Sequence, residues 1–225
     1  MIHILFEQSG TFKHAFNLLG YEAITYDIEN RFNKTDVVID LFNEIAKASA
    51  YLPSIFDNIK ENDFVIAFFP CTHFSGQNDL IYNKQFRAFK QWDELKINQY
   101  INDRKNKRFE FYNILTNLIH IVTNKRIKFI FENPYHRNYL LTTDKFRVPS
   151  LIIHDRKKLG DSMKKPTMFY HYNFELVNND IELVFNNDLV IRKHNDLNKG
   201  ISRSIIEKEF AINFINKYLK HGVLK

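Results

Sequence analysis

A lone cysteine followed by a short polar stretch is the first feature of this sequence that could do chemistry. Cys71 is the only cysteine, and it lies in PCTHFSG, residues 70–76, directly after the apolar run FVIAFF. A cysteine thiolate is a strong nucleophile, so Cys71 is a candidate for covalent catalysis. The alternative is an inert packed thiol, because free cysteine is among the residues most often buried in proteins.

The pair Glu132-Asn133 is the second candidate, because it directly follows another apolar run, IKFIF at residues 127–131. A carboxyl group at such a position could donate or accept a proton during a reaction. The neighbouring amide could orient the carboxyl or the nearby backbone. Alternatively, Glu132 is an ordinary surface carboxylate.

Both candidates lie at the ends of predicted strands. Apolar runs alternate with segments of helical periodicity, which is typical of an α/β fold with a mostly parallel sheet and helices on both faces. Ligands of such sheets bind beyond the carboxyl ends of the strands, so we expect the site there. The predicted strands are residues 2–6, 23–27, 37–40, 64–69 and 127–131, with further extended runs at 150–154 and 167–176. The predicted helices are residues 11–20, 108–125 and 202–221.

Size and composition favour a single reduced domain. The 225 residues suit one α/β domain, and one cysteine excludes an intramolecular disulfide or a thiolate zinc cluster. The histidines are scattered without ligand spacing, so we expect no metal site. The start MIHILFEQSG has no signal-peptide pattern and no apolar run is long enough for a membrane span, so we expect a cytoplasmic protein. The net charge of +6 favours an anionic partner, although a Lys- and Asn-rich composition alone also gives such a charge.

Residues 77–108 form a basic and aromatic segment that the minimal sheet does not need. Basic side chains beside aromatic ones suit the binding of single-stranded or flipped-out nucleotides. The alternative is a pair of solvated helices whose aromatic side chains pack on the core. The basic residues of the segment are Lys84, Arg87, Lys90, Lys96, Arg104, Lys105, Lys107 and Arg108, and the aromatic ones include Tyr82, Phe86, Phe89, Trp92 and Tyr100.

Taken in order, these motifs resemble the cytosine-5 DNA methyltransferase family. ILFEQSGTFKHAFNLLGYEAITYDIEN, residues 4–30, has the layout of that family's start, which holds S-adenosylmethionine. PCTHFSG matches its Pro-Cys-x-x-Phe-Ser motif, and FENPY, residues 131–135, matches its Glu-Asn motif. The resemblance covers about the first 140 residues. It implies a Rossmann-like methyltransferase fold and methyl transfer from S-adenosylmethionine to carbon-5 of cytosine in DNA, or in another cytosine-containing nucleic acid or nucleotide.

The resemblance also implies roles for individual residues. Cys71 would add to carbon-6 of the base, Glu132 would contact ring nitrogen 3, and Asn133 would orient Glu132 or nearby backbone. Asp27 or Glu29 would bind the ribose hydroxyls, although aspartates in such loops also cap helices. The residues expected around the cofactor are Phe6, Gly10, Thr11, Asp27, Glu29, Asp40, Leu41 and Pro70. Those expected to contact the substrate are Ser75, Lys84, Arg87, Arg156 and Lys165.

The sequence departs from the family pattern in three places. Gly10 stands alone where the family has Phe-x-Gly-x-Gly. The family's Gln-x-Arg-x-Arg motif is replaced by DRKKLGDSMKKPTMFYHY, residues 155–172, and the stretch between Tyr172 and Lys199 is too short for a full target-recognition region. One alternative is therefore a catalytically degenerate protein of this fold that binds nucleic acid or a nucleotide. Another is an amino-group methyltransferase, whose Asp/Asn-Pro-Pro-Tyr motif is faintly matched by NPY at residues 133–135.

Overall fold

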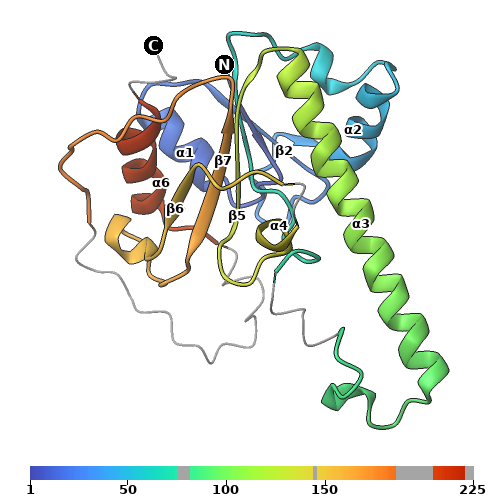
Figure 1. Ribbon diagram of the computed structural model, residues 1–225. Coiled ribbons are helices and arrows are strands. Elements are labelled where there is room, and N and C mark those ends of the chain that lie inside the picture. The colour runs from blue at the N-terminus through green and yellow to red at the C-terminus, as the bar shows by residue number, and fades with distance from the viewer. Residues whose placement is uncertain (76–81, 144–145, 186–204, 221–225) are drawn as a thin grey trace.

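The protein is an α/β sandwich in which one sheet lies between two layers of helices (Figure 1). The computed structural model describes residues 1–75, 82–143, 146–185 and 205–220. Gly76 and the start of the predicted basic segment lie outside the described residues, as does the second half of the stretch between Tyr172 and Lys199.

The sheet has seven strands in the order β3-β2-β1-β4-β5-β7-β6. All neighbouring strands pair in parallel except β7, which runs antiparallel to both β5 and β6. The mostly parallel sheet predicted from the sequence is thereby confirmed. The strands are β1 (Ile2–Leu5), β2 (Ala23–Asp27), β3 (Val37–Val38), β4 (Phe64–Ala67), β5 (Lys128–Pro134), β6 (Leu151–Ile153) and β7 (Thr167–Tyr172).

Strand β5 is longer than predicted at its C-terminal end, because it continues past the apolar run through Glu132, Asn133 and Pro134. The cause is the pairing with β7, in which Glu132 lies opposite Phe169 and Pro134 lies opposite Thr167. The candidate carboxyl group is thus fixed within a strand and not on a loop.

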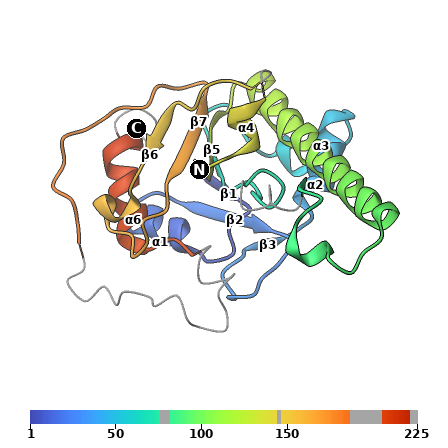
Figure 2. The same ribbon diagram turned by 60° about the horizontal axis from the view of Figure 1, so that its bottom comes forward.

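The helices cover both faces of the sheet, as predicted (Figure 2). Helices α1 (Thr11–Leu18) and α6 (Lys208–Phe214) lie on one face, and α2 (Leu41–Ser49) and α3 (Glu94–Asn124) on the other. A single π turn, η5 (Ile215–Leu219), extends α6. The short elements are η1 (Ile55–Asp57), η3 (Arg87–Phe89), α4 (Tyr139–Thr142) and η4 (Arg156–Leu159).

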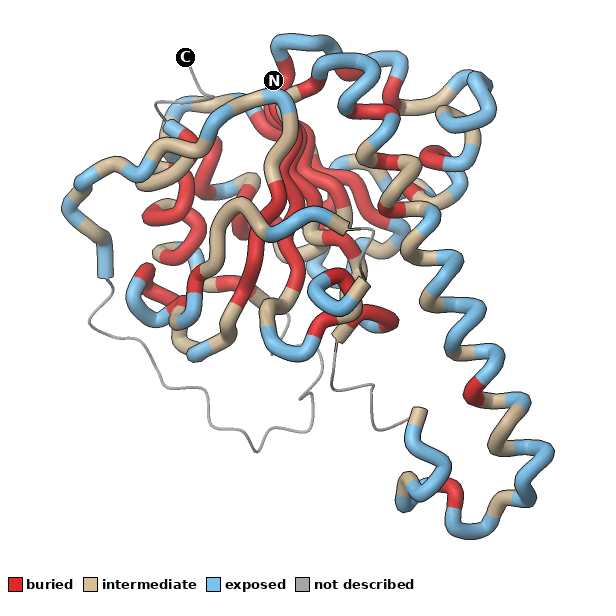
Figure 3. The backbone as a smooth tube through the Cα atoms, viewed as in Figure 1, coloured by how far each residue is buried: buried red, intermediate tan, exposed pale blue. Residues whose placement is uncertain are grey.

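The central strands are buried on both faces (Figure 3). Successive side chains of a strand point to opposite faces, so β4 supplies two separate cores. Phe64 and Ile66 join the cluster under α1 and α6, whereas Val65 and Ala67 join the cluster under α2 and α3. Both cores are rich in phenylalanine, and this packing fixes the strand ends that carry the site.

Helix α3 begins fourteen residues before its predicted start at residue 108, because Asp93 caps it (108 − 94 = 14). The Asp93 side chain accepts a hydrogen bond from the Lys96 backbone N–H at 2.8 Å. The first half of α3 extends beyond the sheet, away from the main body (Figure 1). We call residues 82–108 the arm. None of the helices in the described part of the chain is long and apolar enough to cross a membrane.

Candidate active site

A cavity of about 630 Å³ lies beyond the carboxyl ends of the parallel strands. It opens where the chain order reverses between β1 and β4, which is the usual ligand position in such sheets. Segments that follow β1, β2, β3 and β4 form its walls, and β5 contributes Glu132. Of the residues predicted from the sequence, those that line it are Phe6, Asp27, Glu29, Asp40, Leu41, Pro70, Cys71, Glu132, Arg156 and Lys165.

Cys71 lies on the loop that follows β4, with its side chain at the cavity wall. The loop turns tightly, because the Cys71 carbonyl accepts the backbone N–H groups of Phe74 at 2.9 Å and Ser75 at 2.8 Å. Burial raises the pKa of the Cys71 thiol, and the charge of Glu132 raises it further, while Lys165 acts in the opposite direction. Without a ligand, this environment therefore disfavours the reactive thiolate.

Glu132 is buried in β5, with 8% of its surface exposed, and still lines the same cavity as Cys71. Its Oε1 accepts a hydrogen bond from the hydroxyl of Thr167, the first residue of β7. Thr167 is itself fully buried. This hydrogen bond holds the carboxyl group at the cavity wall, and nothing in the sequence around Thr167 indicates such a role.

Asn133 points away from the cavity and does not line it. Its side-chain amide donates a hydrogen bond to the Phe69 carbonyl at 3.1 Å, and its oxygen accepts one from the Asn138 amide at 2.7 Å. Phe69 directly precedes Pro70 and Cys71. Asn133 is therefore placed to hold the backbone of the cysteine loop against β5, which is one of the two roles that the sequence suggested for it.

The acidic residues expected at the cofactor end are already engaged with neighbouring groups. The Asp27 side chain accepts the Glu29 backbone N–H at 2.9 Å, and burial raises the pKa of this carboxyl group. Glu29 forms an ion pair with Arg31. Asp40 caps α2 by accepting the backbone N–H groups of Phe42 and Asn43. Capping and ligand binding are compatible here, since all three acids also border the cavity.

Gly10 and Thr11 were predicted to surround the cofactor, but they do not line the cavity. Gly10 has a φ of 67°, and a Cβ atom there would lie 2.9 Å from the Cβ of Lys34. The glycine is thus required by the turn into α1. The Thr11 hydroxyl donates to the Ile206 carbonyl at 3.2 Å, which ties this turn to the segment before α6.

The predicted substrate residues fall in different places. Lys165 lines the cavity, and so does Arg156, which is buried in an ion pair with Asp161 and stacks over Phe210 at 4.7 Å. Ser75 does not line the cavity and bridges instead to Asn138. Lys84 and Arg87 also lie away from the cavity, on the arm.

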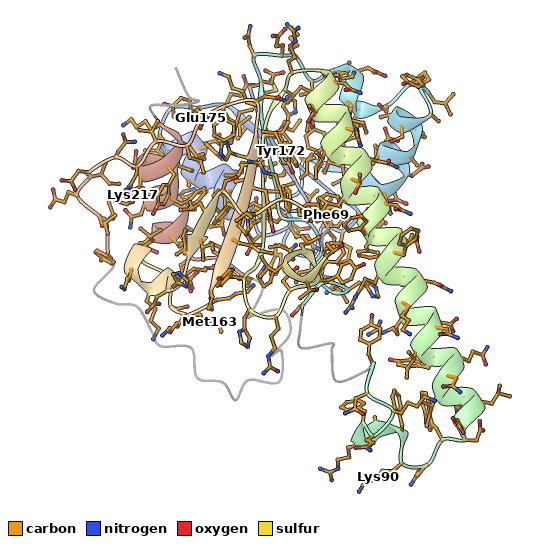
Figure 4. The ribbon with its side chains drawn as sticks, in the orientation of Figure 1. Phe69, Lys90, Met163, Tyr172, Glu175 and Lys217 are labelled. Carbon is orange, nitrogen blue, oxygen red and sulfur yellow. The ribbon has the colours of Figure 1, made fainter. Side chains whose placement is uncertain are left out.

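Aromatic side chains of the arm pack against one another. Phe89 is buried between Phe86, Trp92 and Tyr100, at ring-centroid distances of 5.2–5.6 Å. One alternative drawn from the sequence required these rings to pack on the central core, and they do not. They build a small cluster of their own near the tip, where Figure 4 places Lys90 far from Phe69 at the site. Most basic side chains of the arm are exposed, whereas Arg104 and Arg108 are half-buried and Arg108 donates a hydrogen bond to the His73 carbonyl at 2.8 Å.

Two further features of the site have no counterpart in the predictions. Glu7 lines the cavity although it is buried, with 6% of its surface exposed. In addition, a hollow of about 440 Å³ lies on the surface near Lys165, on the other side of the segment 164–166. We call it the basic hollow after four of its lining residues, His136, His154, Lys158 and Lys164, although Asp155 lines it as well. His136 follows β5, whereas the other three come from the segment between β6 and β7.

No His, Cys, Asp or Glu side chains within the described ranges are grouped so that three or more could hold a metal ion. Comparison of the chain with models of protein families and with curated proteins gave no match. Function is therefore inferred from the residues of the site and the motifs that carry them.

Proposed function

We propose that this protein transfers a methyl group from S-adenosylmethionine to carbon-5 of cytosine through a covalent adduct with Cys71. The observation that carries the proposal is that Cys71 and Glu132 line the same cavity from neighbouring strand ends. The substrate is a cytosine-containing nucleic acid, with DNA as the first candidate, or a cytosine nucleotide. The sheet with helices on both faces is the kind of fold that the resemblance to cytosine-5 methyltransferases implies.

The cavity suits S-adenosylmethionine in size and in the chemistry of its walls. Its volume of about 630 Å³ lies in the range of small-molecule sites, roughly 300–1,000 Å³. Asp27 and Glu29 offer acceptors to ribose hydroxyls, and the apolar side chains of Leu41 and Phe42 suit an adenine ring. Bound there, the donor would supply an electrophilic methyl group and a positive charge.

Cys71 would act as the nucleophile. Its sulfur forms a bond to carbon-6 of cytosine, which moves an electron pair toward carbon-5 and ring nitrogen 3. Carbon-5 can then accept the methyl group, after which its proton leaves and the carbon–sulfur bond breaks. A cation in the cavity would lower the pKa of the thiol, so occupancy of the donor site favours the thiolate.

Glu132 would stabilise the charge that builds on the base during this addition. A carboxyl group at ring nitrogen 3 can donate or share a proton there. The hydrogen bond from Thr167 limits the rotation of this carboxyl group, and Asn133 limits the movement of the loop that carries Cys71. The two reacting groups are thus held by the same strand, β5.

The experiment that tests the proposal uses an oligonucleotide containing 5-fluorocytosine. The adduct with Cys71 forms and is methylated, but carbon-5 has no proton to lose, so the protein stays covalently attached. Cys71→Ser should abolish both trapping and transfer from labelled donor, while binding of S-adenosylhomocysteine is kept. Glu132→Gln should slow transfer by about two to four orders of magnitude.

Equal methyl transfer by the wild type and by Cys71→Ser would overturn the mechanism. Duplex DNA, single-stranded DNA, RNA and cytosine nucleotides assayed in parallel identify the substrate. Glu110→Gln, an exposed change in α3, serves as the matched control for loss of a carboxylate.

A catalytically degenerate protein that binds nucleic acid or a nucleotide is the second candidate. The observation that favours it is the raised pKa of the Cys71 thiol, which disfavours a nucleophile in the ligand-free protein. This candidate predicts binding of S-adenosylhomocysteine or of nucleic acid with no transfer to any of the four substrates.

A further inference from the structure

Arg108 contacts three segments that are far apart in the sequence. It lies in α3 at the point where the arm joins the main body, and its side chain is half-buried. Its Nε donates a hydrogen bond to the His73 carbonyl at 2.8 Å. Its guanidinium lies over the ring of Tyr82 at 4.2 Å and over the ring of Tyr139 at 4.8 Å. Arg108 therefore contacts the loop that carries Cys71, the start of the arm and helix α4.

The hydrogen bond to His73 holds the part of this loop that follows Cys71. The next carbonyl, that of Phe74, accepts the backbone N–H of Tyr139 at 2.8 Å, and the rings of Phe74 and Tyr139 stack at 6.2 Å. Two successive carbonyl groups of the loop are thus bound from α3 and from α4. Because Asn133 holds the residue before Pro70, Cys71 lies between two fixed points of the backbone.

Tyr82 connects the arm to the same guanidinium. Its hydroxyl donates a hydrogen bond to the Arg104 carbonyl at 3.3 Å, about one helical turn before Arg108. The start of the arm therefore packs on the turn of α3 that carries Arg108. Farther along, α3 is anchored in the core by Leu115 and Leu118, which are fully buried. The base of the arm and the loop that carries Cys71 thus share one side chain.

An arginine suits this junction by its shape. The planar guanidinium stacks on aromatic rings while its N–H groups donate in fixed directions, and a lysine ammonium cannot reproduce both contacts. The charges that act on the pKa of the Cys71 thiol are those of Glu132 and Lys165. Arg108 is therefore placed to act on Cys71 through the geometry of the backbone.

We propose that Arg108 is a positioning residue for Cys71 and that it links the arm to the loop that carries this cysteine. The inference rests on the proposed function and deepens it, because it names the side chain through which the arm acts on the nucleophile. A shift of Tyr82 would move the guanidinium, which would in turn move the His73 carbonyl, two residues from Cys71. Covalent addition is sensitive to such shifts, since a misplacement of about 1 Å can cost about 100-fold in rate.

The rate at which iodoacetamide alkylates Cys71 tests the link without any methyl transfer. Arg108→Gln frees the loop around the half-buried thiol and should raise this rate about three- to tenfold, as expected for one hydrogen bond and its stacking. Arg108→Lys keeps the charge but loses the stacking and the Nε donor, so it should raise the rate by a similar factor. Tyr82→Leu removes one stacked ring and should raise it about two- to threefold.

A double-mutant cycle distinguishes a link through Arg108 from a general loosening of the protein. In the Arg108→Gln background, Tyr82→Leu should have no further effect on the alkylation rate, because the contact that it removes is already absent. Tyr139→Leu should still raise the rate in that background, since Tyr139 contacts the loop directly. The matched controls are Arg126→Gln and Tyr51→Leu, two exposed changes outside the cavity, which should leave the rate unchanged.

Turnover gives a second readout. With an oligonucleotide substrate, Arg108→Lys should lower kcat about 10- to 100-fold and keep KM within about twofold, because a misplaced nucleophile affects the chemical step and not binding. Should Arg108→Gln fail to fold, the same cycle with Arg108→Lys and Tyr82→Leu decides the question.

Additive effects of Tyr82→Leu and the Arg108 variant would overturn the link. An alkylation rate of Arg108→Lys equal to that of the wild type would also overturn it, because the role would then belong to the charge. The proposed function fails separately: if the cycle is non-additive as predicted but the wild type transfers no methyl group, the link stands and the catalytic proposal falls. If methyl transfer occurs while the effects add, the catalytic proposal stands and the link falls.

Discussion

At the scale of single residues, the surroundings of Cys71 control its reactivity. Burial and the nearby carboxylate of Glu132 both favour the protonated thiol, and the ammonium of Lys165 opposes them. A thiol held in this state should react slowly with electrophiles while the cavity is empty. Under the proposed mechanism, a positive charge in the cavity would activate it, which would couple the chemistry to occupancy of the site.

This balance predicts the rate at which Cys71 is alkylated. Glu132→Gln removes a negative charge, lowers the pKa of the thiol and should speed alkylation by iodoacetamide at pH 8 by about two- to tenfold. Lys165→Gln should slow it. The measurement is clean because the chain has one cysteine. Rates that rise in both variants would show that exposure of the thiol, and not charge, limits the reaction.

Residue types at strand ends allowed much of the site to be predicted from the sequence. Cys71 and Glu132 each follow an apolar run, and parallel strands bring such positions to one edge of the sheet. Glu7 and Thr167 could not be found in this way. The contribution of Glu7 depends on a left-handed turn at Phe6, and that of Thr167 depends on an antiparallel pairing with β5. The left-handed turn lies at a residue other than glycine, and the pairing is a tertiary feature, so neither leaves a recognisable pattern in the sequence.

At the scale of elements, the sheet was easier to predict than the helices. Strands buried on both faces read as apolar runs, so all seven were located to within a few residues. Helix α2 was missed, although Asp40 caps it, because its start was interpreted as a cofactor contact. The start of α3 was placed too late, because its first half contacts no core and so lacks an apolar stripe.

The arm provides a prediction at this scale. Lys84 is paired with Glu94 at 3.1 Å, so Arg87 and Lys90 are the better candidates for phosphate contacts near the tip. Replacing both with glutamine should lower the salt slope of binding to single-stranded DNA by up to about 1.4, or about 0.7 for each contact. The slope is measured by fluorescence anisotropy of a labelled oligonucleotide across a salt series.

The matched control replaces Lys60 and Arg126, which precede β4 and β5 and so lie at the edge of the sheet opposite the cavity. That pair should leave the slope unchanged. An equal loss of slope in both double variants would assign binding to overall charge, and an unchanged slope in the arm variant would leave the arm as a solvated projection.

At the scale of the whole molecule, the cavity and the basic hollow share one segment of chain. Residues 164–166 contribute Lys165 to the cavity and Lys164 and Pro166 to the hollow. Under the proposed function, a base held at Cys71 would leave its flanking phosphates close to Lys158 and Lys164, two lysines of this hollow, which Asp155 also lines. The two lysines would then offer substrate contacts outside the cavity.

Charge reversal in the basic hollow tests this arrangement. Lys158→Glu together with Lys164→Glu should raise KM for an oligonucleotide about tenfold or more, because both changes repel phosphate. The kcat should stay within about twofold, since neither residue lines the cavity. Affinity for S-adenosylhomocysteine should not change. A fall in kcat at an unchanged KM would instead point to distortion of the neighbouring Lys165 and Thr167.

The antiparallel strand β7 sets an order in which the site can be completed during synthesis. A ribosome makes the β1–β4 half and Cys71 first, and then β5 with Glu132, at which point β5 is still an edge strand. Its partner strand begins only at Thr167, which also supplies the hydroxyl bound to Glu132. Cys71 is thus synthesised nearly a hundred residues before Thr167, whose hydroxyl binds the Glu132 carboxyl group (167 − 71 = 96). Nascent chains that stop before β7 would expose the edge of β5 and would lack the hydroxyl that binds Glu132.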